Sequence, residues 1–550
     1  MERVGVVSWP KEAEVTYVAE GYWREQPLGA LLWQWAEERG GRIALVDGER
    51  RLSYRELAET ADALAENLAG QGLKDGDNLL VQLPNSWELV VLLLACFRLG
   101  VAPVMMLPAH RDYELSGVGG HTRVAAIAVP DLCRGYDHQA LAARVSAGFD
   151  WPCLTLVSGT EVNPGNVDLR SLTAVTGDVA ARRARLDAAA PNPGDVAVFL
   201  LSGGTTGLSK VIARTHNDYE YNARQSGAVC GLDEDTVYLV ALPAGHNFPL
   251  ASPGILGTLM VGGRVVMLPT PSPRTAFATI ARERVTTVAA VPAVVQHWTT
   301  AVAEFEPDLS SLKLVQVGGS LFAPEDHHRA VKELGCHVQQ SFGMAEGLLN
   351  YTRFDDDPEV VATTQGRPIS PHDEVLIVDE DGRPVPAGES GELLTRGPYT
   401  PRGYFNAPEH NARAFTADGW YRTGDVVRID PASGNFVVTG RIKDLINRGG
   451  EKISADEVER LVLLLDHVAE AAAVAAPDPV MGERVCLYVT LHPGGALELD
   501  DLKQLFARHQ VAAFKVPERI EVVAEMPYTA VGKIDKKVLR QLAAAVPAGQ

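Results

Sequence analysis

Short apolar runs alternate with longer helix-like segments through most of this 550-residue chain. The runs are rich in valine, isoleucine and leucine, and clear examples lie at 196–201, 237–242, 286–291 and 314–317. A strand of a parallel sheet is buried on both faces and is followed by a covering helix. The alternation therefore predicts an α/β fold with helix-covered sheets of the parallel type.

The pattern changes after about residue 373. Hairpin-like runs at 374–378 and 391–395 flank the turn-rich Asp379-Glu380-Asp381-Gly382, which predicts a smaller β subdomain over about 373–440. Beyond Gly440 the chain returns to mixed helix and strand. We therefore expect a large N-terminal domain over 1–440 and a small α+β C-terminal domain over 441–550.

A helix start lies early in the small domain. Ser454 and Glu457 have the spacing of a capping box, in which each side chain satisfies a backbone amide of the other. Apolar residues then follow at helical spacing, namely Val458, Leu461, Val462 and Leu465. This face is expected to pack on a strand over 485–491.

Charge and composition exclude several classes of protein. Fifty Lys and Arg against 70 Asp and Glu give a net charge of −20, which disfavours a nucleic-acid partner. The longest apolar run, 89–97, stops at Arg98 and is about half of a membrane span, so we expect a buried helix there. The six cysteines show no metal-ligand spacing, and the chain start lacks a secretory signal pattern. These features favour reduced, mostly buried thiols in a cytoplasmic protein with no membrane partner.

A glycine-rich segment carries the first chemical signal. It reads Leu201-Ser202-Gly203-Gly204-Thr205-Thr206-Gly207-Leu208-Ser209-Lys210 and lies between two apolar runs. Its glycines let the backbone approach a ligand, and its amides and hydroxyls can donate to phosphate oxygens. It is not a P-loop, because no glycine directly precedes Lys210. Taken alone, the segment would fit a simple hairpin equally well.

Four later segments accompany this loop in order. They are Gln340-Ser341-Phe342-Gly343-Met344-Ala345-Glu346, Tyr421-Arg422-Thr423-Gly424-Asp425, Gly440-Arg441-Ile442-Lys443-Asp444 and Gly532-Lys533. Together the five segments closely resemble the adenylate-forming superfamily of acyl-CoA synthetases, luciferases and peptide-synthetase adenylation domains. The resemblance covers almost the whole chain from about residue 28. It implies an enzyme that uses ATP to convert a carboxylic acid to its acyl-adenylate and then passes the acyl group to a thiol.

The resemblance also implies a nucleotide site with ATP and Mg²⁺ as cofactors. Its residues would be Ser202, Gly203, Thr205, Thr206, Gly207, Lys210, Gly318, Gln340, Asp425, Arg441 and Lys533. Attack of a carboxylate on the α-phosphorus requires positive charge at both the attacked and the departing phosphate. Glu346 would hold the metal, Asp425 and Arg441 would bind the ribose, and Lys533 would bridge the carboxylate and the α-phosphate as a catalytic residue. Taken singly, each of these residues would more commonly be a solvated charge.

A hinge is implied at Lys443, about which the small C-terminal domain would rotate between the two half-reactions. One pose would bring Lys533 to the substrates. The other would present the segment from Arg448 to Lys452, where Gly449 and Gly450 would allow a pantetheine arm to pass. The same glycines could also form only a turn before the capped helix.

Longer matching strings narrow the resemblance to stand-alone aryl-acid AMP ligases of siderophore and nonribosomal peptide pathways. The strings lie at 245–254, 339–346, 350–353 and 446–452. Such ligases transfer the acyl group to the phosphopantetheine of an aryl carrier protein. The implied acid pocket contains His246, Asn247, Phe248, Ser252, Gly319 and Ser341.

Individual pocket positions suggest which acid is bound. Asn247 stands where amino-acid-activating relatives usually carry an aspartate, so the substrate should lack an α-amino group. By resemblance, Ser252 falls where 2,3-dihydroxybenzoate ligases carry a serine and salicylate ligases tend to carry a cysteine. A salicylate bound there would leave the Ser252 hydroxyl group without a partner, which favours the dihydroxy acid. Ser341 departs from the valine that those ligases usually carry, and it could meet a polar ring atom or only bond the backbone. His246 could line or gate the pocket, or serve packing alone.

Sequence therefore predicts activation of 2,3-dihydroxybenzoate. Salicylate and 3-hydroxypicolinate remain alternatives for the acid, and an aryl-CoA ligase remains an alternative for the acceptor. An inactive nucleotide-binding interaction protein is the alternative from another class, although Lys533, Glu346 and Asp425 are all present.

Overall fold

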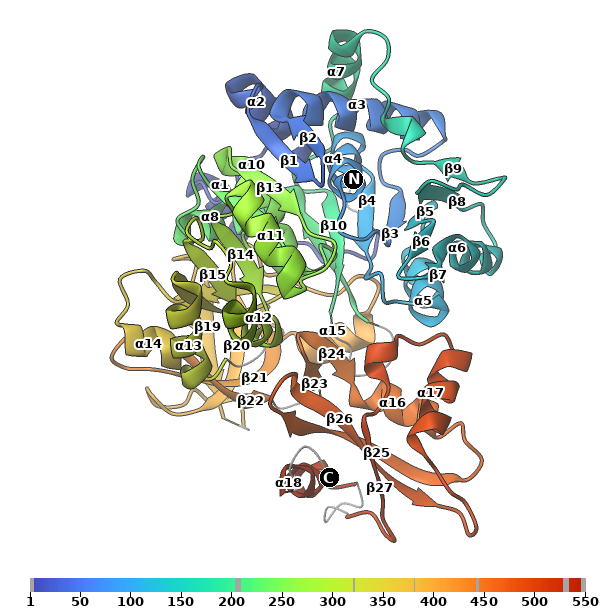
Figure 1. Ribbon diagram of the computed structural model, residues 1–550, viewed down its shortest axis with the longest axis vertical. Coiled ribbons are helices and arrows are strands. Elements are labelled where there is room, and N and C mark those ends of the chain that lie inside the picture. The colour runs from blue at the N-terminus through green and yellow to red at the C-terminus, as the bar shows by residue number, and fades with distance from the viewer. Residues whose placement is uncertain are drawn as a thin grey trace.

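The computed structural model describes residues 4–202, 209–319, 322–379, 381–441, 445–527 and 534–545. We call the described residues up to 441 the body and those from 445 onward the tail. The tail lies beneath the body in Figure 1, in orange to red.

Two large sheets form the body. Within the described residues, one sheet has nine strands, in the order β18 (Arg367–Pro368), β17 (Gly347–Tyr351), β16 (His337–Met344), β15 (Leu314–Val317), β14 (Thr287–Ala290), β12 (Val237–Val240), β13 (Arg264–Met267), β1 (Ile43–Asp47) and β2 (Arg50–Ser53). The other has seven described strands, in the order β11 (Val211–Thr215), β10 (Val196–Leu201), β4 (Ala102–Met105), β3 (Asn78–Val81), β5 (Ala126–Pro130), β8 (Leu154–Ser158) and β9 (Val167–Asp168).

The strand directions confirm the predicted α/β class. Neighbours from β16 to β1 pair in parallel, and so do neighbours from β10 to β9. Each of the four apolar runs forms or contains a strand, and helix α4 (Trp87–Leu99) contains the apolar run at 89–97. This helix is buried along almost its whole length and shares one hydrophobic cluster with residues of both sheets.

A four-stranded antiparallel sheet follows, made of β19 (Glu374–Val378), β20 (Gly391–Arg396), β21 (Tyr421–Ile429) and β22 (Phe436–Arg441). The two expected hairpin strands are the first two of this sheet. The tail has its own sheet, in which β24 (Glu451–Ser454), β23 (Leu445–Arg448), β26 (Gly482–Leu491) and β25 (Val468–Asp478) are adjacent in that order and β27 (Arg519–Val522) pairs with β26. The expected boundary near Gly440 falls within β22 and stays a prediction.

Helices cover both faces of the tail sheet. Helix α16 (Ala455–Val462) begins as expected, because the Ser454 side chain accepts from the Glu457 amide at 3.3 Å. Its apolar face packs with α17 (Leu499–Arg508) against Val485, Leu487 and Val489. Helix α18 (Lys536–Ala545) covers the opposite face and lies in the lower part of Figure 1.

The burial of the thiols and the hydropathy of the helices bear on two further sequence expectations. All six cysteines are unpaired; Cys96, Cys230 and Cys486 are buried and the other three are half-buried. Among the described residues, no helix combines the length and the apolar character that crossing a membrane would require.

Candidate active site

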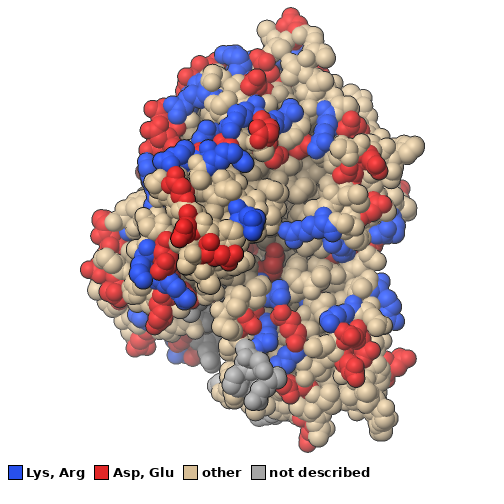
Figure 2. Space-filling model, viewed as in Figure 1, with Lys and Arg blue, Asp and Glu red and all other residues tan. Residues whose placement is uncertain are grey.

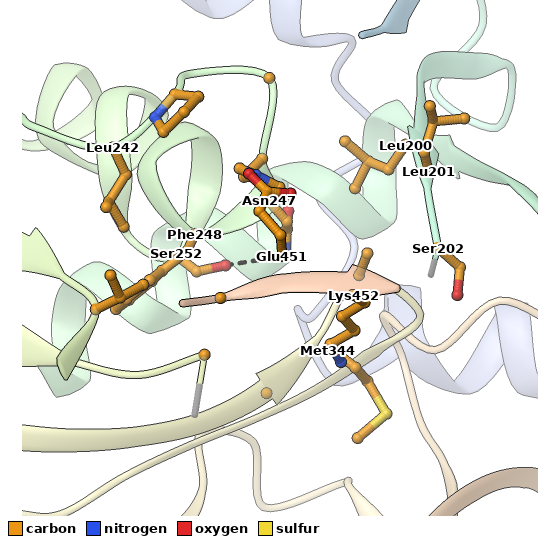
Figure 3. Close-up of a pocket in the computed structure, with 18 of the residues that line it drawn as sticks. Leu200, Leu201, Ser202, Leu242, Asn247, Phe248, Ser252, Met344, Glu451 and Lys452 are labelled. Atoms are coloured by element: carbon orange, nitrogen blue, oxygen red, sulfur yellow. Dashed lines mark hydrogen bonds and ion pairs between the residues drawn. The ribbon is translucent and has the colours of Figure 1, made fainter. Parts of the chain in front are cut away.

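A pocket lies where the body meets the β23–β24 hairpin of the tail. In Figure 2 it opens as a hollow between the upper and lower parts of the molecule, and Figure 3 shows side chains that line it. Ten of the predicted site residues line this pocket: Ser202, His246, Asn247, Phe248, Ser252, Gly319, Ser341, Glu346, Gly449 and Gly450. The structure therefore brings together segments up to 248 residues apart in sequence, from Ser202 to Gly450.

Asn247 is held in one orientation by its neighbours. It begins the short helix α9 (Asn247–Ala251), and Tyr219 Oη donates to its Oδ1 at 2.9 Å. Its Nδ2 donates to Ser252 Oγ at 3.0 Å, as the dashed line in Figure 3 shows. Because a side-chain amide has two N–H donors, Asn247 keeps one for a substrate oxygen.

The Asn247 contact changes one argument made from the sequence. Ser252 is buried, with a relative exposure of 1%, but its oxygen already accepts a hydrogen bond from Asn247. Salicylate would therefore leave only the Ser252 hydroxyl hydrogen without a partner, so the expected penalty against salicylate concerns this donor alone. Ser252 can still donate its hydroxyl hydrogen to a 3-hydroxyl group.

Ser341 bonds the backbone in this structure. Its hydroxyl donates to the Val317 carbonyl at 3.2 Å, across the β15–β16 pairing. Gly318 lies directly behind it, and a Cβ atom at residue 318 would come within 2.2 Å of Ser341 Oγ. The close approach explains why glycine is needed at residue 318. The hydrogen bond to Val317 gives the Ser341 hydroxyl group a partner within the protein, so its presence does not require a polar atom in the ring of the substrate.

Glu346 presents a fixed carboxylate to the pocket. Tyr404 Oη donates to its Oε1 at 2.7 Å, and the Tyr404 and Tyr421 hydroxyl groups are 3.0 Å apart. Glu346 itself is buried. Magnesium sites commonly use one or two carboxylates together with phosphate and water oxygens. The anchored carboxylate of Glu346 fits that pattern.

The tail hairpin closes one side of the pocket. Gly449 and Gly450 form its turn with φ values of 56° and 91°, a backbone region that favours glycine. A Cβ atom at Gly450 would lie 2.8 Å from Val291 Cγ1. Asn447 Nδ2 donates to the Gly319 carbonyl and so ties the hairpin to the body.

His246 lines the pocket and meets the tail. Its Nε2 lies 3.3 Å from Glu451 Oε1. Burial alone would lower the pKa of His246, but the Glu451 carboxylate raises it above the ordinary value. Burial alone would raise the pKa of Glu451, and His246 holds it below the ordinary value. The two side chains thus form a polar contact between body and tail at the pocket wall.

Four predicted nucleotide residues whose side chains the structure describes lie outside the pocket lining. They are Lys210, Gly318, Gln340 and Asp425. Gln340 Nε2 donates to the carbonyls of Val361 and Ala362 in α14 (Pro358–Thr363) at 2.8 and 2.7 Å. Asp425 on β21 pairs in register with Arg441 on β22, so the backbones of the two predicted ribose ligands are neighbours across this antiparallel strand pair.

Other predicted residues are not described by the structure. Gly203, Thr205, Thr206, Gly207, Lys443 and Lys533 lie outside the described residues. The described neighbours of Lys533 are anchored to the tail sheet: the Asp535 amide donates to the Pro527 carbonyl at 2.7 Å, and Ile534 packs against the cluster under α18. That cluster is on the face opposite α16.

Three tyrosines support the pocket without having been identified from the sequence. Tyr351 lines it, and its hydroxyl donates to the Ser252 carbonyl at 2.8 Å. Its position inside the matching string 350–353 was the one available signal. Tyr219 and Tyr404 act through Asn247 and Glu346, and no motif or spacing marks either of them.

Comparisons with known proteins agree with this geometry. A family model described as AMP-binding enzyme matches residues 32–405, and one described as AMP-binding enzyme C-terminal domain matches 457–533. The chain is 59% identical over 543 residues to a salicylyl-CoA synthase / salicylate adenylyltransferase from a Streptomyces species, covering 98% of both chains. It is 45% identical over 537 residues to the 2,3-dihydroxybenzoate-AMP ligase of Bacillus subtilis strain 168, covering 98% of this chain and 97% of that protein. Among solved structures, apo MbtA from Mycobacterium smegmatis is similar with a TM-score of 0.73 and 43% identity, covering 98% of each chain.

Proposed function

The chain belongs to the AMP-binding enzyme family as an ATP-using aryl-acid ligase, and on this premise we propose that its acid carries a hydroxyl group ortho to the carboxylate. The observation that supports the proposal is the oriented Asn247 amide at the pocket. One free N–H of that amide can donate to a phenolic or carboxylate oxygen. A neutral amide at this position offers no counter-ion to an α-ammonium group.

Salicylate is the first acid that we propose, and 2,3-dihydroxybenzoate is the second. Salicylate is favoured by the activity in the name of the 59% identical relative and by the hydrogen bond that the Ser252 oxygen already accepts from Asn247. The dihydroxy acid is favoured by the hydrogen that Ser252 can still donate. For 3-hydroxypicolinate the support is weaker, because Ser341 already donates to the Val317 carbonyl.

For adenylation, we propose that Asn247 orients the acid and that Glu346 holds Mg²⁺, which would neutralise phosphate charge when bound. Asp425 and Arg441 would bind the ribose, and the loop from Ser202 to Lys210 would bind phosphates through its amides. Lys533 would supply a positive charge between the carboxylate and the α-phosphate. This half-reaction requires the tail to turn about Lys443, because the described neighbours of Lys533 are held against the α18 face.

For the second half-reaction, we propose that the described pose is the one that accepts a pantetheine thiol. The hairpin turn at Gly449 and Gly450 lies at the pocket and carries no side chains there. A narrow arm can therefore pass close to the backbone. The acceptor is proposed to be the phosphopantetheine of an aryl carrier protein, with coenzyme A as the second candidate because the 59% identical relative is named a CoA synthase.

The test is ATP–pyrophosphate exchange with salicylate, 2,3-dihydroxybenzoate, 3-hydroxypicolinate and benzoate. We expect exchange with the two ortho-hydroxybenzoates and much weaker exchange with benzoate, which has no ortho-hydroxyl group for Asn247. Failure of all four acids would refute the proposal and favour the inactive nucleotide-binding protein. Acyl transfer from the best acid is then compared between coenzyme A and a holo aryl carrier domain.

A further inference from the structure

A buried ionic cluster joins the body to the tail beside the pocket. Lys515 Nζ lies 3.0 Å from Glu114 Oε1 and 2.9 Å from Glu457 Oε1. The three side chains are 7%, 4% and 4% exposed. Glu114 belongs to α5 (Asp112–Thr122) of the body, whereas Lys515 ends the short helix η2 (Ala513–Lys515) of the tail.

Glu114 is oriented by the start of its own helix, α5, and its side chain is bound by residues of the tail. Its Oε2 accepts from the Arg111 amide at 2.8 Å, which caps the start of α5. Its Oε1 accepts from Lys515 and, at 3.4 Å, from the Ala512 amide. Burial alone would raise the pKa of Glu114, but the nearby Lys515 ammonium holds it below its ordinary value. The carboxylate is therefore charged and presents one oxygen to the tail.

The first turn of α5 is a docking surface for the tail. Tyr113 packs against the hydrophobic cluster that α16 and α17 share with the tail sheet. Nearby, Tyr136 Oη donates to Gln510 Oε1 at 3.3 Å. The ionic cluster thus lies inside a packed contact, where water screens the charges least.

The cluster is asymmetric with respect to a tail rotation. Lys515 and Glu457 both belong to the tail and would move together, whereas Glu114 would stay with the body. Rotation would break the Glu114 contact and leave the Glu457 contact intact. The Glu114–Lys515 pair therefore favours the described pose over any pose in which the two units separate at α5.

We propose that Glu114 is a positioning residue for the thiol-transfer half-reaction. Glu114 binds Lys515 and thereby keeps the β23–β24 hairpin at the pocket. The role rests on the proposed two-step function. Glu114 does not line the pocket and touches no reacting atom. It acts through the position of the tail.

The principal variant is Glu114→Gln, which keeps an oxygen for the Arg111 amide and removes the charge. We expect acyl transfer from a preformed aryl-adenylate to the thiol to slow by about tenfold or more. The variant loses the buried ion pair with Lys515 that stabilises the described pose, so this pose becomes less populated. ATP–pyrophosphate exchange should stay within about twofold of wild type, because that step does not need this pose.

A matched control is Glu88→Gln. Glu88 is also buried and ion-paired, 2.6 Å from Arg170, but both residues belong to the body. The control should leave the ratio of the two half-reaction rates unchanged, even if it lowers the melting temperature. Equal slowing of both half-reactions in Glu114→Gln, or unchanged transfer, would overturn the proposal.

Hydrogen exchange provides a readout that needs no substrate. The Ala512 amide donates to Glu114 across the contact, so Glu114→Gln should speed exchange of the 512–515 amides while Glu88→Gln should not. Unchanged protection of this segment would also overturn the proposal. If no aryl acid supports pyrophosphate exchange, the proposed function fails, and the hydrogen-exchange comparison still decides whether Glu114 holds the tail.

Discussion

Replacing Asp373 by asparagine should stabilise the protein increasingly as the pH rises toward 8. Burial raises the pKa of this carboxyl from 3.8 to about 8. Its Oδ2 accepts from Tyr399 Oη at 2.5 Å and from the Ser370 amide at 3.2 Å. Asp373→Asn keeps an oxygen acceptor for these donors and removes the group that resists ionisation.

The sign and size follow from proton linkage. Between pH 4 and 8 the unfolded chain has released the Asp373 proton while the folded chain retains it, so folding takes up a proton. The free energy of unfolding then falls by about 1.4 kcal/mol for each pH unit in this window. From pH 5 to 7, wild type should lose about 2.7 kcal/mol that the asparagine variant keeps.

Denaturant unfolding of both proteins at pH 5, 6 and 7 measures this difference. The gap between the two unfolding midpoints should widen steadily with pH. A matched control is Asp235→Asn, at a side chain that is 81% exposed, for which the gap should stay constant. Parallel pH curves for wild type and Asp373→Asn would refute the inference that the carboxyl is neutral in the folded protein.

Three further variants test the proposed chemistry. Lys533→Ala should slow pyrophosphate exchange by about 10²-fold and spare transfer from a preformed adenylate; equal loss in both steps would contradict its assignment. Ser252→Cys should move the relative kcat/KM from 2,3-dihydroxybenzoate toward salicylate by about tenfold, and an unchanged ratio would show that residue 252 does not select the acid. Tyr404→Phe removes the donor to Glu346 and should raise the Mg²⁺ concentration for half-maximal exchange by about tenfold, whereas an unchanged requirement would place the metal elsewhere.

The sheets were predictable because their sequence signal is local. The runs at 196–201 and 314–317 coincide with β10 and β15, since strands buried on both faces need continuous apolar sequence. The start of α16 at Ser454 followed from a capping pattern only four residues long. The six residues expected at the acid all line the pocket, and five of them lie in contiguous strings that resemblance to relatives could identify.

Contacts between distant residues were not predictable in the same way. Glu114 and Lys515 are 401 residues apart, and each alone has the pattern of a solvated charge on a polar face. The hydrogen bond from Asn247 to Ser252 depends on the backbone path of α9, and no sequence pattern indicated that the Ser252 oxygen already has a donor. Such contacts depend on which surfaces the fold brings together, and sequence spacing does not encode that.

Only residues 442–444 separate the end of β22 from the start of β23. The four Cα-to-Cα steps from residue 441 to residue 445 span at most about 15 Å. The start of the tail therefore stays within that distance of the end of β22 at every rotation angle. Its local concentration near the pocket is then fixed by the covalent chain. Dilution of the protein should leave the docking equilibrium unchanged, and two molecules would gain little by exchanging their tails.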